Sequence, residues 1–574
     1  MLYKRRNAPL TPQLFQNPTC EYRATPFWAW NNKLDANDLK WQIEQFKTMG
    51  FGGFHMHVRT GLATEYLSDE YMSIVKECIE KARNEDMLAW LYDEDRWPSG
   101  AAGGIVTKDP DYRAMHLLFT RNSYDDESKS FQDETRRAIG KRTNSGKLIA
   151  CYDIVLSNDG RLKSYKRINP GENASGFILY AYEEVALQDP WFNNQTYVNT
   201  LDKTSVAEFI RVTYERYKDI AAKDLGLLVP AIFTDEPQFT RKSTLSFAHE
   251  EKDVTLPWTF DLPESFKKQY GEDLLSNLPE LLWDLPDGAI SATRYRYHDH
   301  VAERFAAAFA DQCGDWCEKH NLMLTGHMME EPTLESQTAA LGDAMRSYRS
   351  FQLPGIDILC DHREFTTAKQ AQSASRQFGC PGVLSELYGV VNYDFDFREH
   401  KLQGDWQAAL GVTVRVPHLS WVSMNGEAKR DYPQTFNYQA PWYKEYPYIE
   451  DHFARLNTVL TRGKPVCRVG VIHPVESYWL HWGVQETTAA IRDQMDRDFL
   501  NLTDWLLRDC IDFDFISESL LPEQFDPSKV TKNCFPVGEM AYEAVIIPNM
   551  QTIRASTLSS LEMFGNAGGN VIFT

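Results

Sequence analysis

The feature that most constrains this chain is a repeated unit, in which a short apolar run ends on a polar residue and is followed by an amphipathic helix. The first clear unit is the run 26–31 (Pro-Phe-Trp-Ala-Trp-Asn). The helix predicted after it, 35–49, places Leu39, Ile43 and Phe46 on one face. Strands that alternate with helices of this length are typical of βαβ units, so the pattern predicts a parallel sheet.

The number of these units predicts how the sheet closes. Eight apolar runs are predicted as its strands: 26–31, 50–58, 87–92, 227–234, 323–326, 356–359, 382–385 and 413–416. Eight strands are what a closed (β/α)8 TIM barrel needs. The chain is 574 residues long, too long for a single core, so further domains are expected.

Two regions depart from the barrel pattern. Between 114 and 190 the runs are short and strand-like, with a hairpin turn at 158–160 (Asn-Asp-Gly), which predicts an inserted antiparallel β domain. The strands predicted there are 115–119, 147–152, 154–156 and 177–182. From 464 a new series begins with strand 469–472, helix 493–509 and strand 544–547, which predicts a doubly wound, flavodoxin-like α/β domain.

The predicted organisation therefore has four parts. They are the first barrel part (1–113), the inserted β domain (114–190), the second barrel part (191–463) and the C-terminal α/β domain (464–574). The last segment ends directly after a strand, which is an unusual place for a sheet to end, so whether the chain is a fragment of a longer protein is left open.

Charge and hydropathy exclude several classes of function. The formal net charge of −21 would repel a phosphate backbone, which argues against a nucleic-acid partner. No run of eighteen apolar residues occurs, so no membrane span is predicted. The basic start of the chain is not followed by an apolar stretch, so no secretory signal is predicted and a cytoplasmic location is expected. Phosphate-loop and dinucleotide motifs are absent, which argues against a nucleotide or nicotinamide cofactor. The oligomeric state is left open.

The strongest candidates for chemistry are carboxylates at predicted strand ends, where barrel active sites lie. Glu236 follows the fourth strand and Glu386 the seventh. Adjacent residues at a strand end point in opposite directions, so we expect Glu236 to face the barrel axis and Asp235 to support it. Glycosidic cleavage needs one carboxylic acid and one carboxylate on opposite sides of the sugar, which this pair would provide. A solvated acidic loop or a structural salt bridge is the alternative interpretation of each residue.

Other polar and aromatic residues near strand ends are candidates for substrate binding. Glu331, after the fifth strand, also competes with the pair for the catalytic role. The dense cluster in 92–100 suits hydroxyl recognition and ring stacking, but acids beside an arginine also stabilise loops, and both interpretations stay open. The predicted substrate-binding residues are Trp30, Asn31, His55, His57, Asp93, Asp95, Arg96, Trp97, Asp235, His327, Glu331 and Tyr388.

His55 and His57 support a rival hypothesis. Two histidines at i and i+2 on one strand face the same side, as in metal-dependent barrel hydrolases of the zinc type. His327 and Asp361 would complete such a site. A non-catalytic sugar-binding protein is a third possibility. The pattern favours sugar hydroxyls as partners of the two histidines, and the metal assignment stays open.

Several motifs together resemble glycoside hydrolase family 106. The segments that carry the resemblance are 26–31, 52–59, 66–70, 91–100, 234–237 and 384–389. The family resemblance implies α-L-rhamnosidase activity with inversion, Glu236 as general acid, Glu386 as the base that activates water, and a cation, usually calcium, near the sugar. It also implies an oligosaccharide or glycoside as the partner. The C-terminal α/β domain resembles the middle domain of some β-galactosidases.

Overall fold

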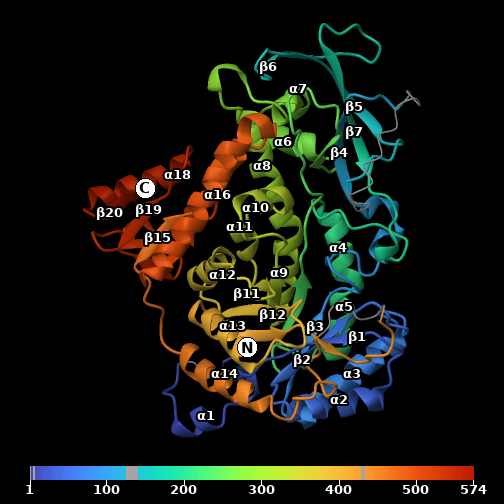
Figure 1. Cartoon of the computed structure of the whole chain (residues 1–574), viewed down its shortest axis with the longest axis vertical. Helices are drawn as coiled ribbons and strands as arrows, with labels where there is room; N and C mark the ends of the chain where they lie inside the picture. The colour runs from blue at the N-terminus through green and yellow to red at the C-terminus, as the bar shows by residue number, and fades with distance from the viewer. Residues whose placement is uncertain (1, 4–6, 125–139, 428–433) are drawn as a thin grey trace.

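The barrel lies in the lower half of Figure 1, which draws the computed structural model; the structure describes residues 2–3, 7–124, 140–427 and 434–574. Its strands are β1 (Phe27–Trp30), β2 (Gly53–Val58), β3 (Leu88–Tyr92), β8 (Ala231–Asp235), β10 (Met323–His327), β11 (Leu353–Leu359), β12 (Val383–Gly389), β13 (Val412–Pro417) and β14 (Ser420–Trp421). All the neighbouring pairs are parallel. The eight predicted strands are therefore present.

The barrel closes through the last two of these strands. β13 pairs with β12, with Leu387 opposite Pro417, and β14 pairs with β1, with Trp28 opposite Ser420. Only two residues separate β13 from β14, so together they act as the eighth strand. The predicted (β/α)8 TIM barrel is confirmed.

Helices cover the outside of the sheet. Those that pack directly on barrel strands are α2 (Ala36–Thr48), α3 (Asp69–Asn84), α9 (Asp311–Lys319), α12 (Phe365–Gln377) and α13 (Phe397–Ala409). The helices α4 (Lys203–Val212), α5 (Tyr214–Ala221), α8 (Ala292–Phe305), α10 (Leu334–Ala340), α11 (Ala344–Tyr348) and α14 (Pro447–Leu460) pack against other helices. The short α1 (Pro12–Gln16), α6 (Leu262–Tyr270) and α7 (Leu274–Asn277) lie outside this repeat. None of the helices among the described residues is both long and apolar enough to cross a membrane.

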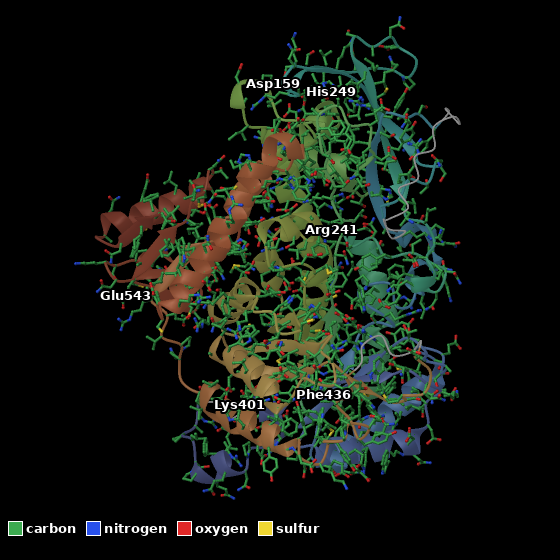
Figure 2. The ribbon with its side chains drawn as sticks, in the orientation of Figure 1. Asp159, Arg241, His249, Lys401, Phe436 and Glu543 are labelled. Carbon is green, nitrogen blue, oxygen red and sulfur yellow. The ribbon has the colours of Figure 1, made fainter. Side chains whose placement is uncertain are left out.

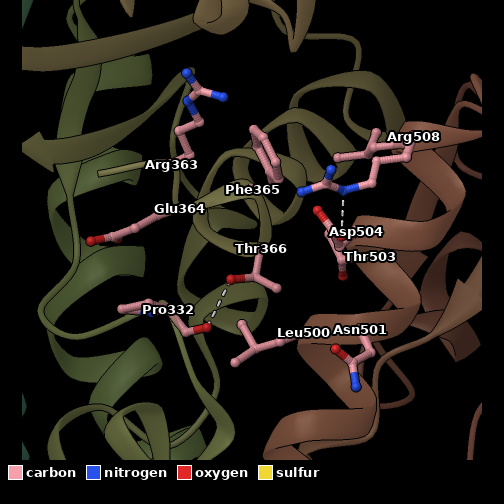
Figure 3. A pocket seen from close by; sticks show the side chains of 11 residues that line it. Pro332, Arg363, Glu364, Phe365, Thr366, Leu500, Asn501, Thr503, Asp504 and Arg508 are labelled. Atoms are coloured by element: carbon pink, nitrogen blue, oxygen red, sulfur yellow. Dashed lines mark hydrogen bonds and ion pairs between the residues drawn. The ribbon is translucent and has the colours of Figure 1, made fainter. Parts of the chain in front are cut away.

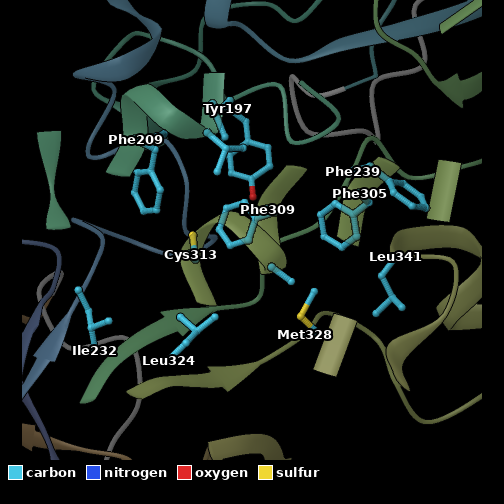
Figure 4. Close-up of a cluster of buried hydrophobic side chains, with 14 of the residues drawn as sticks. Tyr197, Phe209, Ile232, Phe239, Phe305, Phe309, Cys313, Leu324, Met328 and Leu341 are labelled. Carbon is cyan, nitrogen blue, oxygen red and sulfur yellow. The ribbon is translucent and has the colours of Figure 1, made fainter. Parts of the chain in front are cut away.

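The alternation of side chains along each strand divides the barrel core in two. Phe27, Phe233 and Leu384 belong to an inner cluster, whereas Ile232 and Leu324 belong to the cluster between sheet and helices. Figure 4 shows part of that outer cluster, in which strand and helix side chains interdigitate. The inward-facing residues in the first part of these strands therefore form an apolar core. The inward-facing residues at the carboxyl ends of the strands can then contribute to a site.

The inserted region forms an antiparallel sheet in the order β6-β5-β7-β4-β9, at the upper right of Figure 1. Its strands are β4 (Met115–Thr120), β5 (Lys147–Leu156), β6 (Leu162–Arg167), β7 (Phe177–Val185) and β9 (Val254–Pro257). The predicted turn at 158–160 is present, but it connects β5 to β6, a strand that was not among those predicted. The separate strands predicted at 147–152 and 154–156 are wrong, because Asp153 keeps the β ladder unbroken within β5. The sheet also recruits β9 from beyond the predicted insertion.

The C-terminal region is a parallel sheet with the strand order β16-β15-β19-β20. Its elements are β15 (Val469–Ile472), α15 (Val475–Trp479), α16 (Gln485–Arg508), β16 (Phe513–Ile516), α17 (Leu521–Gln524), β17 (Phe535–Val537), β18 (Met540–Tyr542), β19 (Ala544–Ile547), α18 (Ala555–Asn566) and β20 (Asn570–Phe573). Phe499 of α16 packs on one face of the sheet and Phe564 of α18 on the other, so the sheet is doubly wound. One helix prediction needs correction, because α16 begins eight residues before the predicted 493.

Candidate active site

A continuous ring of polar side chains lines the carboxyl end of the barrel interior. It draws one or two residues from β2, β3, β8, β10, β12 and the segments that follow β2 and β13. The members of this polar ring are His57, Arg59, Tyr92, Asp235, His327, Glu386 and His418. All are at most 8% exposed. Buried charges of this kind are costly unless they are paired, so the contacts within the ring decide its chemistry.

One half of the polar ring is centred on His327. The Tyr92 hydroxyl donates to Asp235 Oδ2 at 2.6 Å. His327 Nε2 lies 3.4 Å from Asp235 Oδ1 and 3.0 Å from Glu386 Oε2. Carboxylates are acceptors, so Nε2 carries the proton and donates to Glu386. His327 therefore joins the carboxylates at the ends of β8 and β12.

The other half of the polar ring returns to the start of the barrel. His418 Nε2 lies 3.7 Å from Glu386 Oε1. The Arg59 guanidinium lies 3.5 Å from His418 Nε2 and donates to His57 Nε2 at 3.2 Å. Burial and the neighbouring Arg59 charge lower the pKa of His57 and of His418 well below the usual value. Both rings are therefore neutral, and Arg59 is the cation on this side of Glu386.

Glu236 joins the same cluster from the position after β8. Asp235 continues the inward row of β8, and Glu236 follows it with φ +47°, in the left-handed region that non-glycine residues rarely adopt. Its amide donates to the His327 carbonyl at 3.2 Å. The expectation that Glu236 faces the barrel axis and Asp235 supports it therefore needs correction, because Asp235 occupies the inward row and contacts Tyr92 and His327. Glu236 lies close enough for its carboxyl group to be influenced by the charges of Asp235, His327 and Glu386.

The acids influence each other electrostatically. Burial, reinforced by the charges of Asp235 and Glu386, raises the pKa of Glu236 to about 8. Burial also raises the pKa of Glu386, but the hydrogen bond from His327 opposes that rise. Burial disfavours the charged form of His327, yet the bond to Glu386 and the Asp235 charge raise its pKa well above the usual value. A protonated Glu236 thus lies near an ion-paired Glu386, while Glu236 itself is half-buried and so the more accessible of the two.

Glu331 is also near the cluster but is held more tightly. Its Oε1 accepts from the Met328 amide at 3.0 Å and from the Tyr348 hydroxyl at 2.9 Å. Burial raises its pKa to about 7. Both interactions occupy the same oxygen in a buried position, so Glu331 is less suited than Glu236 to meet a leaving group.

Asp357 is a further, half-buried acid that was not among the predicted site residues. It lies within β11 directly opposite Glu386 in the strand register. Burial and the Glu386 charge raise its pKa well above the usual value. Among the described residues its Oδ1 has no hydrogen-bond partner. The sequence feature that could have identified it is a single acidic residue between Ile356 and Ile358 in a predicted strand. Tyr92, Arg59 and His418 were also missed as members of the site.

Trp30, Asn31 and Tyr388 are among the predicted substrate-binding residues that lie outside the polar ring. Trp30 faces the helices, where its ring lies 5.4 Å from that of Tyr71 on α3. Asn31 uses its side chain to bond both the amide and the carbonyl of Ser423, at 3.0 and 2.8 Å. The Tyr388 hydroxyl donates to the His400 carbonyl at 2.9 Å, and its ring stacks on Phe436, which is labelled in Figure 2.

The segment after β3 is largely engaged in local contacts. Asp93 accepts from Tyr214 at 2.9 Å and from Ser99 at 2.6 Å. Asp95 pairs with Arg96 at 3.0 Å, and both contact Asn193. The half-buried Trp97 lies beside Trp191, with ring centroids 5.4 Å apart. These contacts attach the loop after β3 to the segment around Trp191 and Asn193, which follows the inserted sheet.

His55 lies one layer below the polar ring. It is enclosed by Trp90 and Phe27, and its Nδ1 is 3.0 Å from the Thr25 carbonyl oxygen. Within the described part of the chain, the group able to hold a metal ion consists of Asp235, His327 and Glu386, whose donor atoms lie within 4.8 Å of one another. The predicted histidine pair is not part of it, and Asp361 is exposed.

A cleft of about 610 Å³ lies beside the barrel mouth, between α16 and the loops that follow β10 and β11 (Figure 3). Pro332, which lines it, directly follows Glu331, and Phe365 provides a half-buried aromatic ring. Arg363 and Asn501 add polar groups from opposite walls. None of the polar-ring residues lines this cleft, so it adjoins the site rather than forming it.

Comparison with known proteins identifies the fold. No family model matches the chain, and no curated protein sequence matches it. The solved structure of a rhamnosidase from Novosphingobium sp. PP1Y aligns with a TM-score of 0.67 at 14% identity, over 99% of this chain and 70% of that one. Gan42B, a GH42 β-galactosidase from G. stearothermophilus, aligns at 0.56 with 11% identity, over 96% and 71%. A β-galactosidase from Bacillus circulans sp. alkalophilus aligns at 0.55 with 11% identity, over 97% and 72%. This chain thus shares a TIM barrel with additional domains with these structures.

Proposed function

We propose that this protein is a glycoside hydrolase in which Glu236 is the general acid and Glu386 the general base. The observation that carries the proposal is the contrast between these two carboxyl groups at one barrel mouth. Glu386 is ion-paired with His327, whereas the half-buried Glu236 has a pKa raised to about 8. Glycosidic cleavage requires one carboxylic acid and one carboxylate, and the ion pair with His327 favours the charged form of Glu386 against the effect of burial.

In the proposed reaction, Glu236 donates its proton to the glycosidic oxygen as the bond from that oxygen to the anomeric carbon breaks. Glu386 takes a proton from water, and the resulting hydroxyl forms the new bond to the anomeric carbon from the opposite face. His327 keeps Glu386 ionised before this step. The product sugar would have inverted configuration.

We propose a terminal α-L-rhamnoside as the substrate. The family motifs and the fold shared with a rhamnosidase support this choice. His57, Arg59, Tyr92 and His418 offer nitrogen and oxygen atoms around the base, and these groups are suited to contact sugar hydroxyls. The cleft lined by Phe365 would leave room for the rest of the glycoside.

A divalent cation such as calcium is part of the proposal. The repulsion that raises the pKa values of Glu236, Asp357 and Glu386 would be reduced by a cation, and carboxylate oxygens are the ligands that calcium prefers. Asp235 and Glu386 would hold it with their carboxylate oxygens, and His327 would join them only after losing the proton on Nε2. Its chemistry would be to offset negative charge and bind sugar hydroxyls.

The test is a screen of aryl glycosides with purified wild-type protein and the variants Glu236→Gln and Glu386→Gln. We expect the wild type to release the aryl alcohol from an α-L-rhamnoside, and both variants to release it about 10²–10⁴-fold more slowly while remaining folded. Binding of the sugar without turnover would instead support a sugar-binding protein. If both variants hydrolyse the glycoside at the wild-type rate, the site assignment is wrong.

A further inference from the structure

The carboxylate of Glu94 lies inside a shell of backbone amides just after β3. Its Oε2 accepts from the amides of Gly100, Ala101 and Ala102 at 2.8–2.9 Å, and its Oε1 from those of Asp95 and Gly103. Glu94 is 1% exposed. Successive amides that converge on one point form an anion-binding nest. In this protein the Glu94 side chain takes the place of a bound anion, and the loop that follows it wraps around that side chain.

The geometry of this loop depends on that closure. Gly100 has φ +135°, and a Cβ there would lie 2.5 Å from Val198 Cγ1. Ala102 has φ +49° and Gly103 φ +61°. Conformations of this kind persist only where surrounding contacts hold them. Five backbone amides that donate to one side chain are such contacts. Burial raises the pKa of Glu94 to about 8, and the amide hydrogen bonds limit that rise.

The same loop carries Ser99, which fastens it to the end of β8. The Ser99 amide donates to the Asp235 carbonyl at 2.8 Å, and the Ser99 hydroxyl accepts from the Asp235 amide at 2.8 Å. The hydroxyl in turn donates to Asp93 at 2.6 Å. Both backbone groups of Asp235 are therefore held by one residue of the loop.

Glu236 takes its left-handed conformation immediately after this clamp. Tyr197 extends the support, because its hydroxyl donates to the Ser99 carbonyl at 2.7 Å and accepts from the Gln238 amide at 3.4 Å. The segment 235–238 is thus braced against the loop on both sides of Glu236.

We propose that Glu94 is a positioning residue for the catalytic acid. Its carboxylate shapes the loop 94–103, the loop holds Ser99 against Asp235, and Ser99 keeps Glu236 turned toward the barrel mouth. This inference rests on the proposed function for its catalytic consequence, whereas the coupling of the loop to 235–236 stands on the contacts alone. Glu94 itself touches neither substrate nor reacting atoms.

The test compares Glu94→Gln with Glu450→Gln. Glu450 is an equally buried carboxylate that accepts from the Ala24 amide and from Arg415, at the opposite end of the barrel. Glutamine keeps the shape but places an NH2 donor against amide donors. We expect both variants to lose stability, and only Glu94→Gln to lose about ten-fold or more in kcat per folded molecule, with KM little changed. The pH above which the Glu94→Gln variant loses activity should also differ from that of the wild type.

Hydrogen exchange separates this inference from the proposed function. We expect Glu94→Gln to speed exchange of the amides of Asp235 and Gln238, and Ser99→Ala to do the same without an additive effect in the double variant. Glu450→Gln should leave these amides as in the wild type. Unchanged exchange at 235 and 238 in Glu94→Gln would overturn the inference, even if no glycoside is hydrolysed. Altered exchange with wild-type kcat and pH profile would overturn its catalytic part.

Discussion

The lower and upper halves of the barrel interior lie on the same inward rows but differ in chemistry. On β12, Leu384 belongs to the apolar lower half and Glu386 to the polar ring, two residues later. On β8, Phe233 and Asp235 repeat the arrangement. Packing in the lower half stabilises the barrel, while the upper half keeps buried charges that stability alone would not favour. Residues that stabilise the barrel and residues proposed for catalysis are therefore only two positions apart on the same strand. Substitutions at these positions should affect stability and activity separately.

The largest expected effect is in the upper half. Glu386→Gln removes the proposed base while leaving an isosteric side chain beside His327. We expect kcat on an aryl glycoside to fall by about 10²–10⁴-fold, the range typical of general acid–base catalysis. Circular dichroism should show a folded protein. Steady-state kinetics that match the wild type would remove Glu386 from the mechanism.

The matched change in the lower half is Leu384→Ala. It opens a cavity in the inner cluster, and we expect the free energy of unfolding to fall by about 2–5 kcal/mol. The kcat per folded molecule should remain close to that of the wild type. Denaturant unfolding and active-site titration measure the two quantities. A large loss of kcat in the folded fraction would show that the two halves are not separable.

The pH dependence tests the protonation state of the upper half. Since Glu236 must be protonated to act as the acid and its pKa is raised to about 8, activity should fall as pH rises through about 8. A carboxyl group with a raised folded pKa also contributes stability that is present below its unfolded pKa and is lost as pH rises through the folded value. A pH–rate profile and melting curves measure both. A rate that stays constant to well above pH 8 would contradict the assignment of Glu236.

The smallest expected effect concerns the proposed cation. Added calcium should raise the melting temperature of chelator-treated protein by a few degrees, because a ligand of the folded state stabilises it. Asp235→Asn should reduce that shift, whereas Leu384→Ala should keep it. Equal shifts in all three proteins would indicate that calcium binds elsewhere.

The strands of the barrel were predictable because each is a short apolar run bounded by polar residues. The acids at their ends, Asp235, Glu236 and Glu386, followed from the rule that barrel sites lie at the carboxyl ends of strands. It was harder to predict which side chains of a strand point into the barrel and which point toward the helices. Both faces of a parallel barrel strand are buried, so nothing in the run 26–31 distinguishes inward Phe27 from outward Trp30.

Other parts of the site depend on contacts between distant segments. The left-handed turn at Glu236 is held by His327 and by the loop that carries Ser99. The sequence around Glu236 does not indicate either contact, and a glutamate gives no indication of a positive φ as a glycine would. His418 comes next to Arg59 only because the barrel closes between its first and last strands. Pairings of this kind are properties of the closed barrel.

The most direct test of the central claim is the anomeric configuration of the sugar released from an aryl α-L-rhamnoside, followed by proton NMR from the first turnovers. The account predicts hydrolysis with an inverted first product, because Glu386 acts through water. A retained product would point to a closely spaced pair such as Asp235 and Glu386, whose donor atoms lie within 4.8 Å, and would contradict the assigned roles. Failure to hydrolyse any glycoside in the panel would contradict the proposed function itself.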